Sequence, residues 1–266
     1  MKTIKFLGTA GARFVMLKQL RASGGMWLSW KDTNLIIDPG PGSLVRCLRS
    51  RPRLNPLDLD GIILTHRHLD HSADINVMIE AMTEGGHRPK GRVFAPADAL
   101  EDDPVILKYN RNFVDKIEIL KQNKTYKVKD VTFSTAGLHV HGCQTFGLNF
   151  KEGKKTPLSL ISDTRYFKGL ARKYPGEVLI INVVRYEGRG DIEHLDISDV
   201  IRVLDKSKAR VCILSHFGMT MLKKKPHLVA EDLQARYKDK KIIAAYDGMN
   251  FDLQKHRIKK LNKNKK

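Results

Sequence analysis

The sequence predicts an α/β protein with β-sheets inside and helices outside. Two observations support this fold class. Short apolar runs typical of strands recur in both halves of the chain, and segments with the apolar spacing of helices lie between many of them. The chain has 266 residues, 41% of them hydrophobic, which is enough to bury a full core. We expect a single domain over residues 1–254, followed by a basic C-terminal tail, 255–266.

In the first part of the chain, β-type runs alternate with helical segments. Strands are expected at residues 4–6, 27–30, 35–38 and 61–65. A helix is expected over 41–48, because Pro41 suits a first helical turn. Another is expected over 74–83, where apolar residues recur at helical spacing until Gly85 and Gly86 end it.

The second part of the chain continues the same alternation. Strands are expected at residues 131–135, 146–150, 158–161, 178–184, 211–214 and 242–245. Helices are expected at residues 197–204 and 228–237. Residues 123–125 and 151–155 are expected to be hairpin turns, because Gly, Asn and Lys cluster there between apolar runs.

Composition and cysteine usage exclude several classes of protein. No apolar run approaches the roughly 18 residues of a membrane span, and the first residues have the pattern of a strand rather than a signal peptide. We therefore expect a cytoplasmic protein with no membrane partner. Three cysteines without CxxC spacing do not favour a disulfide framework or a thiolate zinc site. Cys212 is expected in the core, and Cys143 either lines a pocket or lies in a plain loop.

The chain carries a formal net charge of +19, with 48 Lys and Arg against 29 Asp and Glu. A field of this sign attracts polyanions, which favours a phosphate-bearing small molecule or a nucleic acid as the partner. Two other interpretations stay open. Part of the charge lies in the tail, which is also consistent with a solvated end, and dispersed charge is also found on thermophile surfaces.

The residues that carry chemistry are concentrated directly after the apolar run 62–64. His66, His68, Asp70 and His71 follow it at HxHxDH spacing. His66 and His68 alternate along the chain, so their imidazoles point the same way, while Asp70 and His71 turn with the chain toward a second position. A lone histidine is usually structural, but this density of N and O ligands predicts a site for zinc or a similar ion.

The HxHxDH run, together with the segment LIIDPGPG at 35–42, resembles the metallo-β-lactamase superfamily, and the resemblance extends through nearly the whole chain. It implies a four-layered αβ/βα sandwich of two similar halves. It also implies that Asp38 orients a metal ligand or the loop backbone. In the ribonuclease Z-like and phosphodiesterase branches a histidine in the place of His194 protonates the leaving group; its alternative role is to begin the helix at 197–204.

The resemblance also implies the remaining metal ligands. Either His139 or His141 supplies the third histidine of the first ion, and the spacing to Gly147 favours His141. Asp163, in the Ser-Asp-Thr motif, is the expected bridging carboxylate, although an aspartate there also suits a helix cap. His216 ends a late strand. Asp247 either supports the site or caps a turn.

We therefore expect two divalent ions, Zn²⁺ or else Mn²⁺ or Fe²⁺. The expected ligands are His66, His68 and His141 for the first ion, and Asp70, His71 and His216 for the second, with Asp163 between them. Such a pair of ions lowers the pKa of a bridging water, so that hydroxide is available at neutral pH. Asp70 has a second expected role, which is to accept a hydrogen bond from the nucleophile and orient it.

The superfamily hydrolyses several bond types, so the ligands alone do not choose the substrate. The charge, His194 and the Ser-His-Phe-Gly segment favour a phosphodiesterase acting on cyclic nucleotides or short nucleic acids. The interval from His141 to Asp163 lacks the long Gly/Pro-rich insertion that usually forms the tRNA-gripping arm of ribonuclease Z. The alternatives are a carboxylic ester, lactone or thioester hydrolase, and a nucleic-acid-binding protein with little turnover. The sequence leaves open whether the chain forms a homodimer.

Overall fold

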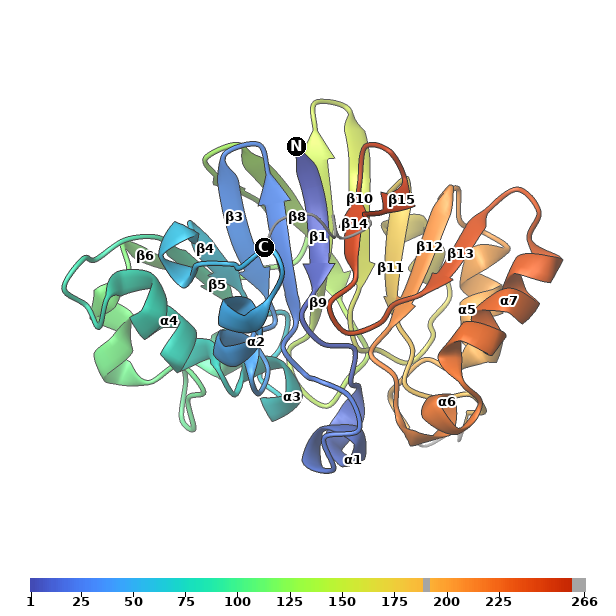
Figure 1. Ribbon diagram of the computed structural model, residues 1–266, viewed down its shortest axis with the longest axis horizontal. Helices are drawn as coiled ribbons and strands as arrows, with labels where there is room; N and C mark the ends of the chain where they lie inside the picture. Colours follow the sequence, from blue (N-terminus) through green and yellow to red (C-terminus); the bar gives the residue numbers. More distant parts are fainter. Residues whose placement is uncertain (189–191, 260–266) are drawn as a thin grey trace.

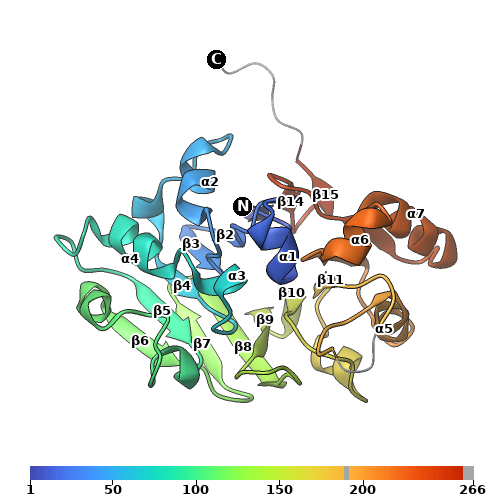
Figure 2. The ribbon, with the colours of Figure 1, turned by 90° about the horizontal axis from the view of Figure 1, so that it is seen from below.

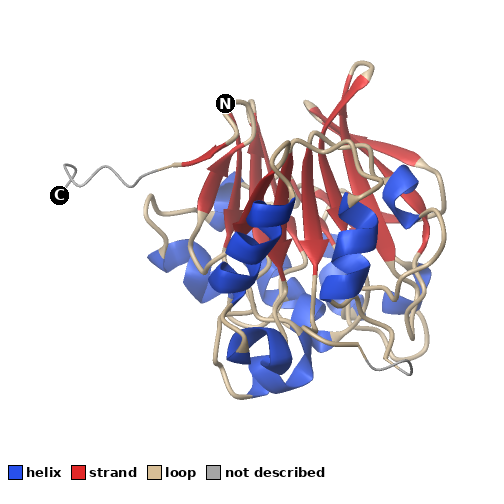
Figure 3. Ribbon diagram, turned by 90° about the vertical axis from the view of Figure 1, so that its right-hand side faces the viewer, coloured by secondary structure: helices blue, strands red, loops and turns tan. Residues whose placement is uncertain are grey.

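The computed structural model describes residues 1–188 and 192–259 (Figure 1). Two β-sheets pack face to face, and helices cover the outer side of each sheet, as the side view in Figure 3 also shows. This arrangement confirms the predicted four-layered αβ/βα sandwich. None of the helices in the described ranges is long and apolar enough to cross a membrane.

The first sheet has eight strands in the order β15–β14–β1–β2–β3–β4–β5–β6. Neighbours from β15 to β3 are antiparallel, and those from β3 to β6 are parallel. The bounds are β1 (Lys2–Phe6), β2 (Met26–Trp30), β3 (Thr33–Ile37), β4 (Gly61–Ile63), β5 (Arg92–Ala95), β6 (Lys116–Ile119), β14 (Asn250–Asp252) and β15 (Arg257–Ile258).

The second sheet has seven strands in the order β13–β12–β11–β10–β9–β8–β7. Neighbours from β7 to β10 are antiparallel, and those from β10 to β13 are parallel, which repeats the mixed pattern of the first sheet. The bounds are β7 (Thr125–Val128), β8 (Val131–Leu138), β9 (Phe146–Glu152), β10 (Lys155–Ile161), β11 (Val178–Asn182), β12 (Val211–Ser215) and β13 (Lys241–Ala244).

Helices α2 and α4 lie on the outer side of the first sheet, and helices α5 and α7 on that of the second. The α-helices are α1 (Ala12–Leu17), α2 (Ser43–Arg49), α3 (Leu69–Ser72), α4 (Ile75–Thr83), α5 (Ile197–Leu204), α6 (Met219–Lys223) and α7 (Pro226–Arg236). Short 3₁₀ helices are η1 (Pro56–Asp58), η2 (Ala97–Ala99), η3 (Lys108–Phe113) and η4 (Leu170–Lys173).

Apolar side chains fill the space between the sheets and also the space under the outer helices. In β11, Val178 and Ile180 pack in the core between the sheets, whereas Leu179 and Ile181 pack on the outer side. Central parallel strands are buried on both faces and are therefore continuous apolar runs in the sequence. This explains why the strands at 178–184 and 211–214 were predictable, with ends that differ by one or two residues.

Three sequence-based expectations need correction. Residues 123–125 are not a hairpin turn, because the strands on either side, β6 and β7, belong to different sheets; the turn at 151–155 does join paired strands, β9 and β10. The expected tail, 255–266, includes β15, which pairs with β14, so the first sheet continues to Ile258. The last part of that tail, 260–266, lies outside the described residues. Strands β5, β6, β7 and β14 were not predicted, because they are short or carry polar residues.

Candidate metal centre

The predicted ligands come together at one end of the sandwich, where strands from both sheets end. His66 follows β4, His141 follows β8, Asp163 follows β10 and His216 follows β12. Carboxyl ends of parallel strands share one edge of a sheet, which is where α/β proteins commonly bind ligands. The Thr65 carbonyl accepts a hydrogen bond from the Phe146 backbone N–H at 3.1 Å, and this bond joins the two sheets beside the cluster.

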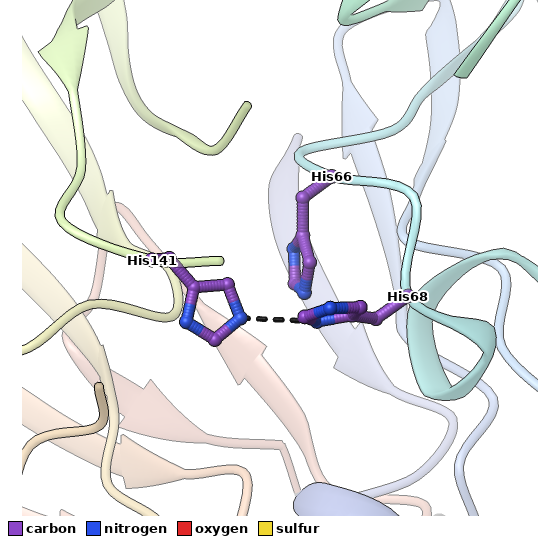
Figure 4. Close-up of side chains that lie close together, drawn as sticks. All are labelled: His66, His68 and His141. Carbon is purple, nitrogen blue, oxygen red and sulfur yellow. Dashed lines mark hydrogen bonds between the residues drawn. The ribbon is translucent and has the colours of Figure 1, made fainter. Parts of the chain in front are cut away.

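The first group consists of His66, His68 and His141, whose rings converge from two different loops (Figure 4). The ring centroids of His66 lie 4.9 Å from His68 and 5.1 Å from His141. His141 Nε2 lies 3.0 Å from His68 Nδ1. His66 is fully buried, and its Nε2 has no hydrogen-bond partner among the described residues. A buried ring nitrogen left without a partner fits a metal ligand.

The second group consists of Asp70, His71 and His216. His71 Nε2 lies 3.2 Å from His216 Nε2, and the latter lies 3.4 Å from Asp70 Oδ2. Asp70 and His71 are both on helix α3, directly after the first two histidines. His216 has a positive φ of 62°, a conformation that a residue other than glycine rarely adopts. This backbone turn directs His216 toward the ends of the first-sheet strands.

Asp163 lies between the two groups, with its side chain only 2% exposed. Its Oδ2 atom faces ring nitrogens of four histidines. The distances are 3.9 Å to His66 Nε2, 3.6 Å to His71 Nε2, 3.5 Å to His194 Nδ1 and 3.3 Å to His216 Nε2. One carboxylate oxygen that is surrounded by four imidazoles has the placement required of a ligand shared by two ions.

Buried polar contacts hold these ligands in orientation. Asp38 accepts hydrogen bonds from the Thr65 backbone N–H at 2.7 Å and from its hydroxyl at 2.8 Å, and its Oδ2 lies 3.0 Å from His71 Nδ1. Asp38 therefore contacts both the loop backbone and an expected ligand, as the resemblance implied. Asn182 Nδ2 donates to Asp163 Oδ1 at 2.8 Å. Sequence reasoning missed Asn182, although a polar residue that ends an otherwise apolar strand is a signal that could have found it.

The structure separates the two candidates for the third histidine. His139 is buried, its Nδ1 lies 3.0 Å from the Asp163 carbonyl oxygen, and its Nε2 contacts the Tyr174 hydroxyl. Both of its ring nitrogens are therefore already engaged, and burial lowers its pKa to about 4. His141 instead lies with His66 and His68, and its Nδ1 donates to the Glu193 carbonyl at 3.0 Å. His141 stays the expected third histidine of the first ion.

Three further residues that the sequence singled out lie at different distances from the cluster of expected ligands. His194 is part of this cluster, because its buried Nδ1 faces Asp163 and has no hydrogen-bond partner in the described part of the chain. Cys143 lies at the edge, with Sγ 3.9 Å from His68 Nε2. Asp247 is not at the cluster. It accepts hydrogen bonds from the backbone N–H groups of Thr9 at 2.9 Å and Ala22 at 2.8 Å, and so it supports neighbouring loops.

Burial and neighbouring charge divide the histidines electrostatically. Burial lowers the pKa values of His66, His68 and His141, which keeps these imidazoles neutral, the form that binds metal. Burial alone would lower the pKa of His71 as well, but the nearby carboxylates, Asp70 first among them, raise this pKa well above its ordinary value. Burial would raise the pKa of Asp163, yet the adjacent histidines hold it well below its usual range. His71 thus binds a proton strongly and would have to release it to a metal ion.

Comparison with known proteins identifies relatives of this chain by sequence. An uncharacterized protein of Methanocaldococcus jannaschii is 26% identical over 236 residues, which cover 86% of both chains. A ribonuclease Z of Methanopyrus kandleri is 28% identical over 122 residues, which cover 44% of this chain and 42% of that protein.

Two solved structures superimpose over 94% of this chain. The metallo-β-lactamase fold protein YhfI of Bacillus subtilis gives a TM-score of 0.76 at 16% identity over 98% of its own chain. A diphosphatase of the PhnP family gives 0.70 at 15% identity over 96% of its chain. At such low identity these two likenesses concern the fold alone. A family model described as a β-lactamase superfamily domain matches residues 33–217, from β3 through the last predicted ligand, and the chain therefore belongs to that superfamily.

Proposed function

We propose that this chain is a two-metal-dependent hydrolase whose substrate contains a phosphodiester. The observation that carries the proposal is the position of Asp163, whose Oδ2 lies within 3.9 Å of four imidazole nitrogens. Nitrogen and carboxylate donors in this number suit zinc, manganese or iron. Membership of the superfamily supports a metal-dependent hydrolase.

We assign His66, His68 and His141 to one ion and Asp70, His71 and His216 to the other, with Asp163 shared. Two divalent ions held there would lower the pKa of a water molecule and polarise a phosphoryl or acyl oxygen. Asp70 is only partly exposed and has an oxygen available to accept a hydrogen bond from the attacking group and orient it. Zinc is our first choice of metal because imidazole nitrogen is its usual ligand.

We assign the proton donor to His194. Its Nδ1 lies against the buried Asp163 carboxylate, and its side chain is 18% exposed, so the residue joins the cluster to the solvent-facing side. Burial lowers the pKa of His194, so a proton placed on this ring is released readily to a leaving oxygen. The position of the ring, at the cluster and partly exposed to solvent, supports this role.

A phosphodiester is favoured over other bonds by the net charge of +19 and by the similarity to a ribonuclease Z. The interval between His141 and Asp163 is the β9–β10 hairpin, whose strands end at Ile161. No room for a separate tRNA-gripping arm exists in this interval, which favours a smaller substrate such as a cyclic nucleotide or a short nucleic acid.

Acyl hydrolysis is the second candidate, and one observation favours it. Helix α1 lies beside α3, which carries Asp70 and His71 (Figure 2). Near the metal centre these helices expose Phe14 (64%), Leu17 (66%) and Leu69 (62%). An apolar rim of this kind suits an apolar acyl group of an ester, lactone or thioester.

A substrate panel on purified protein tests the proposal. The protein is supplied in turn with Zn²⁺, Mn²⁺ and Fe²⁺ and assayed with bis-p-nitrophenyl phosphate, cyclic nucleotides, a thioester and a lactone. We expect cleavage of phosphodiesters that the His68→Ala variant has lost. Cleavage of acyl substrates alone would replace our proposal with the second candidate. No cleavage of any substrate, together with tight salt-dependent nucleic-acid binding, would indicate a binding protein.

A further inference from the structure

A groove of about 1200 Å³ lies on the outer face of the first sheet, between α2 on one side and β14 and β15 on the other. In the view from below, α2 and the pair β14–β15 flank the N-terminal strand (Figure 2). Pockets for small molecules usually measure about 300–1,000 Å³. The size of this groove therefore favours an extended ligand over a single small molecule.

The walls of the groove are strongly basic. They contain six arginines and lysines: Arg46, Arg49, Arg51, Lys255, Arg257 and Lys259. Of these six, only Arg46 has an ion-pair partner within residues 1–188 and 192–259; that partner is Asp247, at 3.4 Å. The cations thus face the groove with little internal neutralisation, which is the electrostatic footprint of a site for a chain of phosphates.

The floor of the groove adds a further buried cation. Lys5 is 5% exposed, and its Nζ donates to the Arg51 carbonyl oxygen at 2.8 Å. Asn250 also lines the groove, and its Oδ1 atom is buried without a hydrogen-bond partner in the described ranges. An acceptor of this kind suits a hydroxyl or amino group of a ligand that enters the groove.

The two carboxylates that line the groove are already occupied. Asp247 accepts from the Thr9 and Ala22 backbone N–H groups, and Asp252 accepts from those of Gln254 at 3.0 Å and Lys255 at 2.9 Å. These carboxylates keep their negative charges, but the seven Lys and Arg side chains that line the groove, Lys5 included, outnumber them. The balance of charge in the groove remains positive.

The end of the groove lies one loop away from the metal centre. Tyr246, in the loop between β13 and β14, lines this end and is 49% exposed. Its neighbour Asp247 holds the loop around Thr9, and Gly8 and Ala10 of that loop line a small cavity beside His71 and His216. An exposed aromatic ring next to a cationic groove is the combination with which proteins bind single strands, because bases stack on the ring.

We propose that this groove binds the sugar–phosphate backbone of a single-stranded nucleic acid, with a base stacked on Tyr246 at the end nearest the metal centre. The proposal deepens the proposed function by naming the substrate class. Cleavage of the bound strand rests on the proposed function, whereas binding of the strand in the groove does not depend on it.

Binding is measured separately from cleavage, on protein kept in EDTA. The probe is a fluorescein-labelled oligouridylate of about 16 nucleotides, the upper end of the site size of common single-strand-binding folds. Fluorescence anisotropy gives the affinity at several salt concentrations, and an oligodeoxythymidylate of the same length distinguishes RNA from DNA. Binding of either single strand supports the groove. If neither binds the EDTA-treated parent protein in low salt, the groove proposal is wrong, whatever the protein hydrolyses.

The groove variant combines Arg49→Gln, Lys255→Gln and Arg257→Gln. Each lost phosphate contact lowers the slope of log K against log salt by about 0.7, so three lower it by about 2 and weaken binding roughly 100-fold in 0.1 M salt. The matched control combines Arg172→Gln, Arg210→Gln and Lys238→Gln, which are all exposed and lie on the side of the second sheet. It removes the same charge, and we expect it to change affinity only a few-fold because salt screens distant charges.

Two further variants separate the groove from simpler explanations. Tyr246→Ala should weaken binding at least fivefold without changing the salt slope, because stacking releases no counterions. Deletion of residues 260–266 removes four lysines that come after the last groove residue, Lys259, in the sequence. This deletion should leave most of the binding in place. Equal losses in the groove and control variants, or complete loss on deleting 260–266, would refute the groove as the binding site. So would heparin binding as tight as that of the oligonucleotide, combined with no effect of Tyr246→Ala.

Discussion

Replacing Asp38 with asparagine tests whether the metal centre depends on the buried contacts beneath it. Asp38 is 4% exposed and lies 3.0 Å from His71 Nδ1. Its carboxylate accepts a hydrogen bond from the Nδ1–H of His71, which leaves Nε2, 3.2 Å from His216 Nε2, as the nitrogen that would bind a metal ion once it loses its own proton. An asparagine that turns its NH₂ group toward His71 instead donates to Nδ1. The ring proton then moves to Nε2, where it blocks a metal.

The magnitude follows from the contacts that change. Loss of a partner that orients a metal-bound histidine typically lowers metal affinity 10- to 100-fold, or about 1.4–2.7 kcal/mol. A hydrogen bond to a charged group contributes about 1.5–3 kcal/mol to stability, so Asp38→Asn should also destabilise the chelated protein by about that amount. The effect should fall on the ion held by Asp70, His71 and His216, while the other ion is retained.

The assay is a chelator-competition titration with Zn²⁺, together with urea unfolding in EDTA. Asp60→Asn is the matched control. Asp60 is also buried and accepts a hydrogen bond from a backbone N–H, that of Asn34 at 2.9 Å. It lies before strand β4, however, whereas the expected ligands lie after that strand. It should lose stability and keep both ions. The reasoning would be refuted if the Asp38→Asn variant bound both zinc ions as tightly as the parent protein, or if Asp60→Asn lost as much zinc affinity as Asp38→Asn.

Three other predictions concern the same cluster. His68→Ala and Asp70→Ala should each abolish hydrolysis and reduce zinc content while the circular dichroism spectrum is kept; metal analysis that matches the parent protein would contradict both assignments. His194→Ala should lower turnover by about 10²- to 10⁴-fold, the range for a lost general acid, with both ions retained, and metal loss would instead make His194 a ligand. Burial would lower the pKa of His216, but Asp163 raises it to about 9 from 6.5. Below that pH a proton therefore competes with the metal ion for His216. The affinity for zinc should rise by up to tenfold per pH unit between pH 6.5 and about 9, and an affinity that does not change with pH would contradict this prediction.

Much of the candidate metal centre was predictable because its expected ligands follow local rules. Four of them lie in the HxHxDH run after a buried strand, where spacing along the chain controls where the side chains point. The central strands were predictable for a similar reason, since parallel strands buried on both faces appear as apolar runs. Edge strands such as β6, whose sequence KIEI mixes charged and apolar residues, carry no such pattern and were missed.

By itself the sequence determined the fold class, the family and the run proposed to bind metal, because these depend on residue type and on spacing between near neighbours. Only the tertiary structure showed that Tyr174 and the Asp163 carbonyl, both distant in sequence, occupy the nitrogens of His139. It also placed Asn182 on Asp163 and gathered α2, β14 and β15 around one basic groove. These contacts depend on the order and register of strands in the sheets, which join segments as far apart in the sequence as Thr3 and Asp252, in a way that no local pattern records.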